Sequence, residues 1–278
     1  KNKTIFSMNE FSITIFKERD FPYNFIIKKV FDKYEIISPR YIPLQVNFNG
    51  DDWGLMLLEE QFHDSFYALN RIKEAPIFKM TNENDFLINV IANFNREEDD
   101  AAKWQGKLET LVYNENDILK KTNIPYDKTN QNLLSIFKNL QEAVVLKEKD
   151  YISKIDNFID IESFGRLAAI TAVFGDWHSL DSRNARYYLN PYDLKIKHIP
   201  SDWVHSKIDK NFFSQHNLFY KSLYNNEKFQ KEYFQTLYEI NNNFLELKND
   251  IEVICKDYGK ICRNLVDIDL IKENINLL

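Results

Sequence analysis

One segment of the sequence, residues 158–202, constrains the fold more than any other. Apolar residues repeat at helical spacing from Phe158 to Val173 and predict an amphipathic helix. A polar loop follows, and residues 185–189 and 194–199 alternate as two strands around a turn at 190–193. The second strand leads directly to Asp202. The sequence therefore predicts a helix, a loop, a hairpin and an acidic residue, in this order.

The region before this segment is rich in strand patterns. Residues 11–15 are strand-like, residues 44–49 alternate between apolar and polar, and an apolar run at 53–58 follows the turn at Gly50. Residues 82–130 are rich in Asn, Asp, Glu and Lys. We therefore predict an α+β protein with two lobes, divided into a β-rich N-terminal lobe, truncated at its start (1–81), a polar insertion or inter-lobe segment (82–130), and a helical C-terminal lobe (131–278).

The C-terminal part of the sequence is dominated by helical periodicity from Phe212 onward. It also carries the two cysteines, Cys255 and Cys262, which are seven residues apart. On one helix this spacing separates them by about 10 Å, which is too far for a disulfide. No further thiol or nearby histidine completes a zinc site. We expect both cysteines to be thiols in the core.

Charge and hydropathy exclude some classes of protein. The sequence has 36 basic and 42 acidic residues, a formal net charge of −6, which disfavours nucleic acid as a partner. No apolar run reaches the roughly 18 residues that a membrane helix needs, so we expect no membrane span. The sequence begins at Lys1 without an initiator Met or a signal-peptide pattern, which indicates a processed or trimmed product.

The loop after the predicted helix carries the residues that are best suited to catalysis or metal binding. Asp176, Asn184 and Asp202 stand in the order found in the catalytic loop of kinase-like proteins, which this segment resembles. In such a site the first Asp orients the acceptor hydroxyl, while the Asn and the second Asp bind metal. Oxygen ligands suit Mg²⁺ or Mn²⁺. Asp181 is a rival to Asp176 for the catalytic role, and local capping of the loop could explain either acid.

His178 adds a second resemblance. Asp176, Trp177 and His178 are similar to the Asp-x-His of aminoglycoside phosphotransferase loops. Asn184 lies eight residues after Asp176, whereas those loops place the Asn five residues after the Asp. We expect His178 to orient the loop through a backbone hydrogen bond. The other histidines are scattered without metal-ligand spacing, which does not support a zinc hydrolase.

Three blocks of the sequence together resemble the CotH-type atypical protein kinases. They are residues 46–60, which contain Asn49-Gly50, Trp53-Gly54 and Glu59-Glu60; residues 161–203, which end in Ile199-Pro200-Ser201-Asp202-Trp203; and residues 227–237, which contain Phe229, Tyr233 and Leu237. Members of that family commonly end the second block with two acids. Here Asp202 supplies one.

The resemblance implies a kinase that uses ATP and Mg²⁺ or Mn²⁺ to phosphorylate a protein, for example a coat or envelope protein. It implies that Glu60 is the acid that orients a phosphate-binding lysine, for which Lys79 is the candidate. His178 and Asp181 accompany Asp176 as candidate catalytic residues, and Asn184 and Asp202 as metal ligands. Relatives suggest a spore-coat, cell-envelope or secreted location.

Two other functions stay open on the sequence alone. A catalytically silent kinase-like module that binds a partner would account for the widened loop and the single acid at Asp202. A metal-dependent phosphohydrolase could use the same carboxylates to activate water. Phosphate-binding glycine loops and a nucleophile elbow are absent from the sequence, which disfavours other nucleotide-binding and hydrolase folds.

Overall fold

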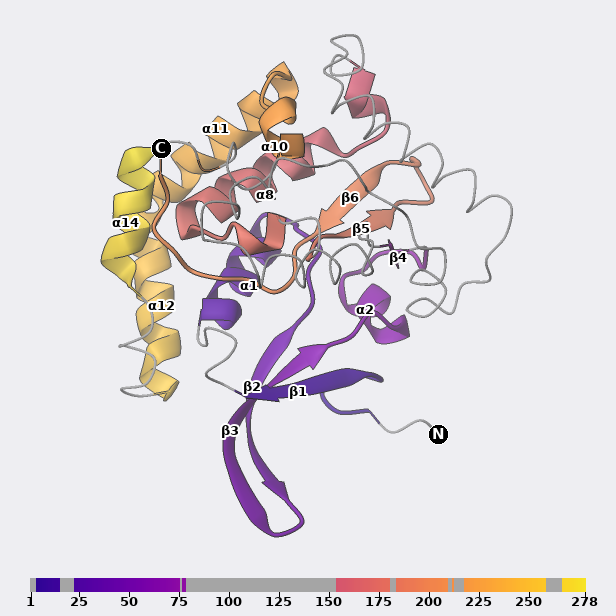
Figure 1. Ribbon diagram of the computed structural model, residues 1–278, viewed down its shortest axis with the longest axis vertical. Helices are drawn as coiled ribbons and strands as arrows, with labels where there is room; N and C mark the ends of the chain where they lie inside the picture. The colour runs from indigo at the N-terminus through magenta and orange to yellow at the C-terminus, as the bar shows by residue number, and fades with distance from the viewer. Residues whose placement is uncertain are drawn as a thin grey trace, which may run out of the picture.

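Helices and two small antiparallel sheets make up the protein (Figure 1). The computed structural model describes residues 4–15, 23–75, 77–78, 154–180, 184–209, 212, 218–258 and 267–278. Both kinds of element contribute to one main hydrophobic core. The predicted α+β class is therefore confirmed.

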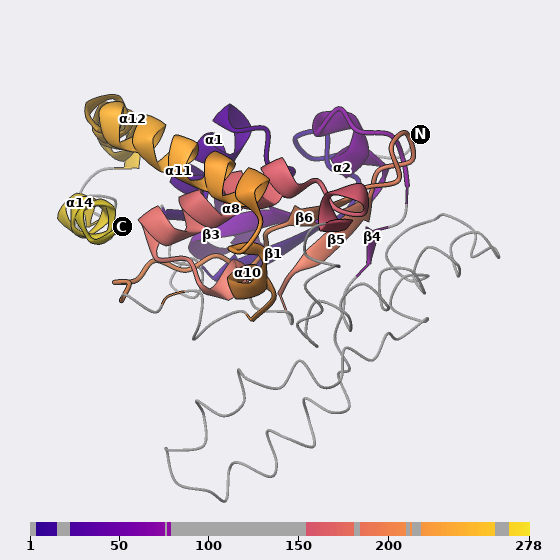
Figure 2. The same ribbon diagram turned by 90° about the horizontal axis from the view of Figure 1, so that it is seen from above.

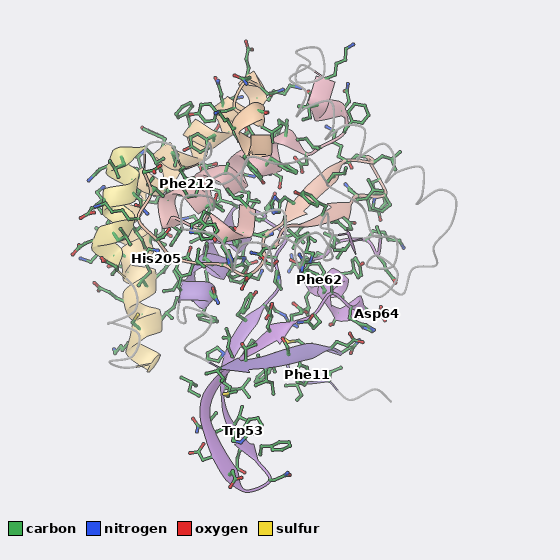
Figure 3. All side chains as sticks on the ribbon, in the orientation of Figure 1. Phe11, Trp53, Phe62, Asp64, His205 and Phe212 are labelled. Carbon is green, nitrogen blue, oxygen red and sulfur yellow. The ribbon has the colours of Figure 1, made fainter. Side chains whose placement is uncertain are left out.

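The first sheet is formed by the N-terminal strands. Its order is β1-β3-β2, and the strands are β1 (Phe11–Ile15), β2 (Tyr41–Phe48) and β3 (Asp51–Glu60). β2 and β3 form the hairpin that the alternating pattern predicts, and the register shifts between Val46 and Asn47. The far end of this hairpin projects away from the helices (Figure 1), and Figure 3 marks Trp53 on it. The Phe48 and Trp53 rings, with centroids 4.8 Å apart, are each about half exposed there.

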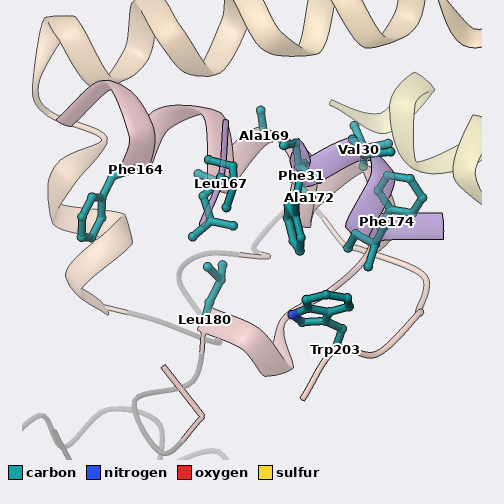
Figure 4. Packing of buried hydrophobic residues seen from close by; sticks show 14 of the residues in the cluster. Val30, Phe31, Phe164, Leu167, Ala169, Ala172, Phe174, Leu180 and Trp203 are labelled. Atoms are coloured by element: carbon teal, nitrogen blue, oxygen red, sulfur yellow. The ribbon is translucent and has the colours of Figure 1, made fainter. Parts of the chain in front are cut away.

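The central helix is α8 (Ile161–Phe174), and nearly all of its side chains are buried. Its apolar residues lie on every face, which is typical of a helix enclosed by the core. The Asp160 side chain caps its first turn by accepting a hydrogen bond from the Ser163 amide at 3.2 Å. Figure 4 shows this helix packing against Phe31 of α1 (Tyr23–Lys33) and against Trp203.

The second sheet carries the predicted hairpin of the C-terminal region. Its order is β4-β5-β6, and the strands are β4 (Ile77–Phe78), β5 (Arg186–Leu189) and β6 (Ile196–Ile199). β4 pairs with β5, so that residue 77 lies opposite Tyr188. The helix α2 (Asp64–Leu69) precedes β4, and both belong to a smaller second core cluster. The pairing of β4 with β5 therefore connects the N-terminal part of the chain to the β5–β6 hairpin, which follows the loop after α8.

Helices complete the C-terminal part, as the periodicity predicts. They are α10 (Leu218–Leu223), α11 (Glu227–Asn242), α12 (Phe244–Tyr258) and α14 (Ile268–Leu277). α11 runs alongside α8 (Figure 2), and Gly165 permits the close approach, since a Cβ at this position would lie 2.9 Å from the Phe229 carbonyl oxygen. Arg166 and Glu232 form an ion pair at 3.3 Å across this contact.

One expectation about the cysteines is wrong. Cys255 is disulfide-bonded, and the sequence contains a single other cysteine, Cys262. The expected spacing of about 10 Å assumed one continuous helix. α12 ends at Tyr258, before the second cysteine is reached, and the assumption therefore fails.

Among the described residues, the main core combines residues of the first and the third predicted region. It contains residues of α1, β2 and β3 together with residues of α8, β6 and the C-terminal helices. The division into 1–81, 82–130 and 131–278, like the two-lobed arrangement, stays a prediction, and the segment 82–130 lies outside the described residues. In the described part of the chain, no helix combines the length and apolar character needed to cross a membrane.

Candidate functional site

The site begins where α8 ends. Gly175 closes the helix in the left-handed region at φ 69°, and the next amide, of Asp176, donates to the Thr171 carbonyl oxygen at 2.7 Å. A Cβ at Gly175 would lie 1.7 Å from the Ser206 carbonyl oxygen. Glycine is thus required here by its backbone conformation and by the close approach of a second chain segment.

Asp176 joins two loops of the site. One oxygen of its carboxylate accepts hydrogen bonds from the Ser179 amide at 3.2 Å and the Val204 amide at 3.1 Å. The other oxygen accepts from the Ser179 hydroxyl at 2.7 Å. The side chain is fully buried. Asp176 therefore caps the short 3-10 helix His178–Leu180 and fixes the segment after Asp202 to it.

Asp202 has a different environment. It adopts a left-handed backbone conformation at φ 59°, which Asp tolerates better than most residues. The Nδ1 atom of His178 lies 2.8 Å from the Asp202 carbonyl oxygen and 3.2 Å from its carboxylate. Because both neighbours are acceptors, Nδ1 carries the hydrogen. The Asp202 side chain is 34% exposed and that of His178 27%, so both are accessible to a ligand.

The segment after Asp202 is anchored to the end of α8. The His205 Nδ1 atom lies 2.8 Å from the Phe174 carbonyl oxygen, and the Ser206 hydroxyl donates to the Gly175 carbonyl oxygen at 2.5 Å. Figure 3 places His205 in the helical part of the molecule, away from the projecting hairpin. These bonds fix the backbone that follows the accessible carboxylate of Asp202.

Trp203 packs the N-terminal sheet onto the site. Its ring lies against those of Phe31 and Tyr41, at centroid distances of 5.1 Å and 4.7 Å. It is almost completely buried, and its Nε1 atom has no hydrogen-bond partner among the described residues. The first residue of β2 thus contacts the residue that follows Asp202.

Asn184 lies on the same loop system. Its side-chain amide donates to the His178 carbonyl oxygen at 3.1 Å, and the Ser201 hydroxyl donates to its backbone carbonyl oxygen. The structure therefore brings together four of the residues that the sequence singles out: Asp176, His178, Asn184 and Asp202. The predicted backbone hydrogen bond of His178 is present, and its acceptor is Asp202.

A histidine that the sequence analysis did not single out forms a hydrogen bond with the loop that follows α8. His198 of β6 is buried, with Nε2 3.1 Å from the Ser179 carbonyl oxygen and Nδ1 2.7 Å from the Tyr220 hydroxyl. Burial lowers its pKa from 6.5 to about 3, and the charge of Arg186 contributes to the lowering. The signal in the sequence is weak, because one histidine in an alternating strand does not reveal its partners.

Glu60 of β3 and Arg40, which precedes β2, form a partly buried ion pair. Glu60 accepts from the Arg40 guanidinium through both carboxylate oxygens, at 2.9 Å and 3.1 Å, and its side chain has no exposed area. The lysine proposed to pair with it, Lys79, lies outside the described residues, as does Asp181. The roles of these residues stay predictions.

The residues around Asp202 supply part of a ligand set for a divalent cation. Among the described residues, no three His, Cys, Asp or Glu side chains are grouped closely enough to hold a metal ion by themselves. Mg²⁺ in phosphoryl-transfer sites is commonly held by one or two carboxylates together with phosphate oxygens and water. A partly exposed Asp202 beside Asn184 suits that mode, whereas the enclosed Asp176 does not.

Comparison with known protein families matches residues 24–269 to the family described as CotH kinase protein. This match includes β2 and β3 of the first sheet, the whole second sheet, α8 and the loops of Asp176 and Asp202, while β1 precedes it. No curated protein matches the chain. Because the match extends over most of its length, the chain belongs to the CotH kinase family.

Proposed function

We propose that the chain transfers the γ-phosphoryl group of ATP to a hydroxyl of a protein acceptor. The proposal rests on membership of the CotH kinase family and on one observation, the accessible carboxylate of Asp202 held beside His178. In the transfer, the acceptor oxygen forms a bond to the γ-phosphorus and the bond to the β–γ bridging oxygen breaks. ADP leaves, and the hydroxyl proton passes to a base of the enzyme.

The proposed roles follow from the different environments of the residues. Asp202 and Asn184 hold Mg²⁺ or Mn²⁺, which neutralises charge on the phosphates when bound. Asp176, a candidate catalytic residue, orders the two loops through its three hydrogen bonds. His178 and Asp181 are then the candidates that orient the acceptor hydroxyl and take its proton, and a partly exposed imidazole can reach an acceptor.

Nucleotide binding by the N-terminal part of the chain completes the proposal. Lys79 contacts the phosphates, and Glu60 keeps the N-terminal sheet in place through Arg40. The contact of Tyr41 with Trp203 gives this sheet a fixed position relative to the residue beside Asp202.

The experiment is transfer of labelled phosphate from ATP, with Mg²⁺ or Mn²⁺, to the protein itself and to a generic protein acceptor. Asp202→Asn should abolish incorporation. Asp193→Asn is the matched control, because Asp193 lies in the exposed β5–β6 turn and accepts a hydrogen bond from the Lys195 amide at 2.9 Å. Full incorporation by Asp202→Asn would refute the assignment, and release of free phosphate without an acceptor would indicate a phosphohydrolase.

A second candidate function is a catalytically silent kinase-like module. It is favoured by the burial of Asp176, whose two carboxylate oxygens are both engaged by protein donors. A site with one accessible acid can retain a nucleotide and a cation without transfer. Nucleotide binding by calorimetry, combined with no incorporation of label by wild type, would support this function over the kinase.

The disulfide bears on the proposed location. Cys255 is disulfide-bonded, and such bonds persist mainly in oxidising environments. This supports the proposed spore-coat, cell-envelope or secreted location and an acceptor protein of the same compartment. Maleimide labelling of the protein isolated from its native source tests it: we expect labelling at the two cysteines only after reduction. Labelling before reduction would place the protein in a reducing compartment.

A further inference from the structure

A chain of hydrogen bonds runs through the buried interior from α10 to the loop of Asp202. Tyr220 on α10 contacts His198, and His198 contacts the Ser179 carbonyl oxygen. Ser179 donates its amide and hydroxyl hydrogens to Asp176, which also accepts from the Val204 amide. The four side chains that form this chain are buried. The network thus connects three separate elements to the backbone two residues after Asp202.

The chemistry of the partners determines how His198 is protonated. A carbonyl oxygen only accepts hydrogen bonds, so Nε2, at 3.1 Å from the Ser179 carbonyl oxygen, carries the hydrogen. In the neutral ring Nδ1 is then an acceptor, and the Tyr220 hydroxyl donates to it at 2.7 Å. The Ser179 carbonyl oxygen therefore selects the Nε2–H tautomer of His198, and the Tyr220 hydroxyl completes the pairing as the donor to Nδ1.

The surroundings of His198 disfavour its protonated, charged form. The rings of Phe164, Tyr187 and Tyr220 lie 5.8 Å, 5.1 Å and 5.7 Å from its ring, centroid to centroid. Burial and the positive charge of Arg186 keep its pKa low, at about 3. The imidazole is neutral at physiological pH, so the hydrogen bond to Ser179 keeps one direction.

We propose that His198, held in its Nε2–H tautomer between the Ser179 carbonyl oxygen and the Tyr220 hydroxyl, is a positioning residue for the phosphoryl-transfer site. This inference rests on the proposed function. His198 fixes the Ser179 carbonyl oxygen and thereby the turn whose amide and hydroxyl bind Asp176. Asp176 in turn holds the Val204 amide and sets the place of Asp202. Removal of a hydrogen bond that orients a metal ligand commonly lowers the metal affinity by about 10- to 100-fold.

The first test is the protonation state of His198 in the wild-type protein. Long-range ¹⁵N–¹H correlation spectra of the histidine rings should show hydrogen on Nε2 and none on Nδ1 between pH 5 and pH 8. Assignment comes from the loss of this signal in His198→Gln. Hydrogen on Nδ1, or titration of the ring within this range, would overturn the proposal without reference to activity.

The second test separates the hydrogen bond from packing. His198→Gln keeps a side-chain N–H donor and should retain most of the Mn²⁺–ATP affinity, whereas His198→Leu fills the space without a donor and should lose about tenfold or more. Tyr220→Phe should weaken binding, and the matched control Tyr67→Phe should not, because Tyr67 donates a buried 2.7 Å hydrogen bond to the Ala75 carbonyl oxygen outside this network. Equal affinities for Gln and Leu variants would overturn the proposal.

The two proposals can fail separately. If the wild-type protein binds no Mn²⁺–ATP, the proposed function fails. The amide resonances of Ser179 and Val204 then test whether the hydrogen-bond network positions the loop. These resonances should shift in His198→Leu and stay near their wild-type values in Tyr67→Phe. Unchanged resonances in His198→Leu would show that the network does not position the loop.

Discussion

The loops of Asp176 and Asp202 are joined by a hydrogen bond, yet they hold their acids in opposite ways. Asp176 is enclosed, and its two oxygens accept three hydrogen bonds from Ser179 and Val204. Asp202 is one-third exposed, in contact with a histidine that is also partly exposed. The difference indicates a division of tasks, in which the first acid stabilises the loop and the second is available to a ligand.

The same contrast explains why sequence position alone is a poor guide to role. Both acids follow a regular element and precede a tryptophan in the sequence. Only the folded chain shows that the amide of Val204 turns back to Asp176. A carboxylate whose two oxygens both accept hydrogen bonds inside the protein contributes to structure, whereas a carboxylate at the surface can exchange water for a cation.

The largest expected effect is that of removing the enclosed acid. Asp176→Ala leaves two backbone amides and a buried hydroxyl without their acceptor, and we expect the free energy of unfolding to fall by about 3–5 kcal/mol. Urea unfolding of both proteins measures this change. A loss below about 1 kcal/mol would contradict a structural role, because substitutions at the surface commonly cost that little.

The second expected effect concerns the turn that presents Asp176. Gly175→Ala places a methyl group against the Ser206 carbonyl oxygen in a left-handed conformation, and we expect a destabilisation of about 2–4 kcal/mol. Gly50→Ala is the matched control: Gly50 also has a positive φ, but no atom lies within 4 Å of the added Cβ. Thermal unfolding should show a larger loss at Gly175, and equal losses would rule out the steric contact as its cause.

The third effect is a dependence of stability on pH. His198 has a pKa of about 3 in the folded protein against 6.5 for an exposed histidine, so the unfolded chain binds more protons between these values. The contribution is fully present above pH 6.5 and is lost as the pH falls towards 3, by about 1.4 kcal/mol per pH unit. Urea unfolding of wild type and His198→Gln at pH 7 and pH 5 isolates it. A parallel decline in both proteins would exclude His198 as the source.

The smallest expected effect on stability belongs to the accessible acid. Asp202→Asn removes a charge from a partly exposed contact with His178, and such contacts contribute about 0–1 kcal/mol. Asn also tolerates the left-handed conformation of this position. Urea unfolding should therefore give nearly the wild-type value. A loss comparable to that of Asp176→Ala would remove the distinction between the two loops.

Local patterns in the sequence are sufficient for much of the fold. The β2–β3 hairpin follows from alternation around Gly50, and α8 from apolar residues that repeat at helical spacing. The hairpin of β5 and β6 lies where the turn at 190–193 predicts it. These elements depend on neighbours in the sequence, which is why a single sequence is enough to find them.

Contacts between distant segments could not be predicted in this way. His198 meets Tyr220 of α10 and Ser179 of the loop, and the spacing of the three residues gives no sign of this. The end of α12 before the second cysteine did have a signal in the sequence, because Gly259 follows Tyr258 directly. The pairing of Glu60 with Arg40, however, needs the register of two strands. Such features depend on tertiary packing.

The most direct test of this account is a crossed comparison of Asp176→Asn and Asp202→Asn, with urea unfolding and Mn²⁺–ATP binding measured on the same samples. We predict that Asp202→Asn keeps the stability of the wild type and loses the ligand. Asp176→Asn should lose stability, because an amide nitrogen replaces one of the two acceptor oxygens. Wild-type affinity in Asp202→Asn, or wild-type stability in Asp176→Asn, would contradict the division of tasks between the two acids.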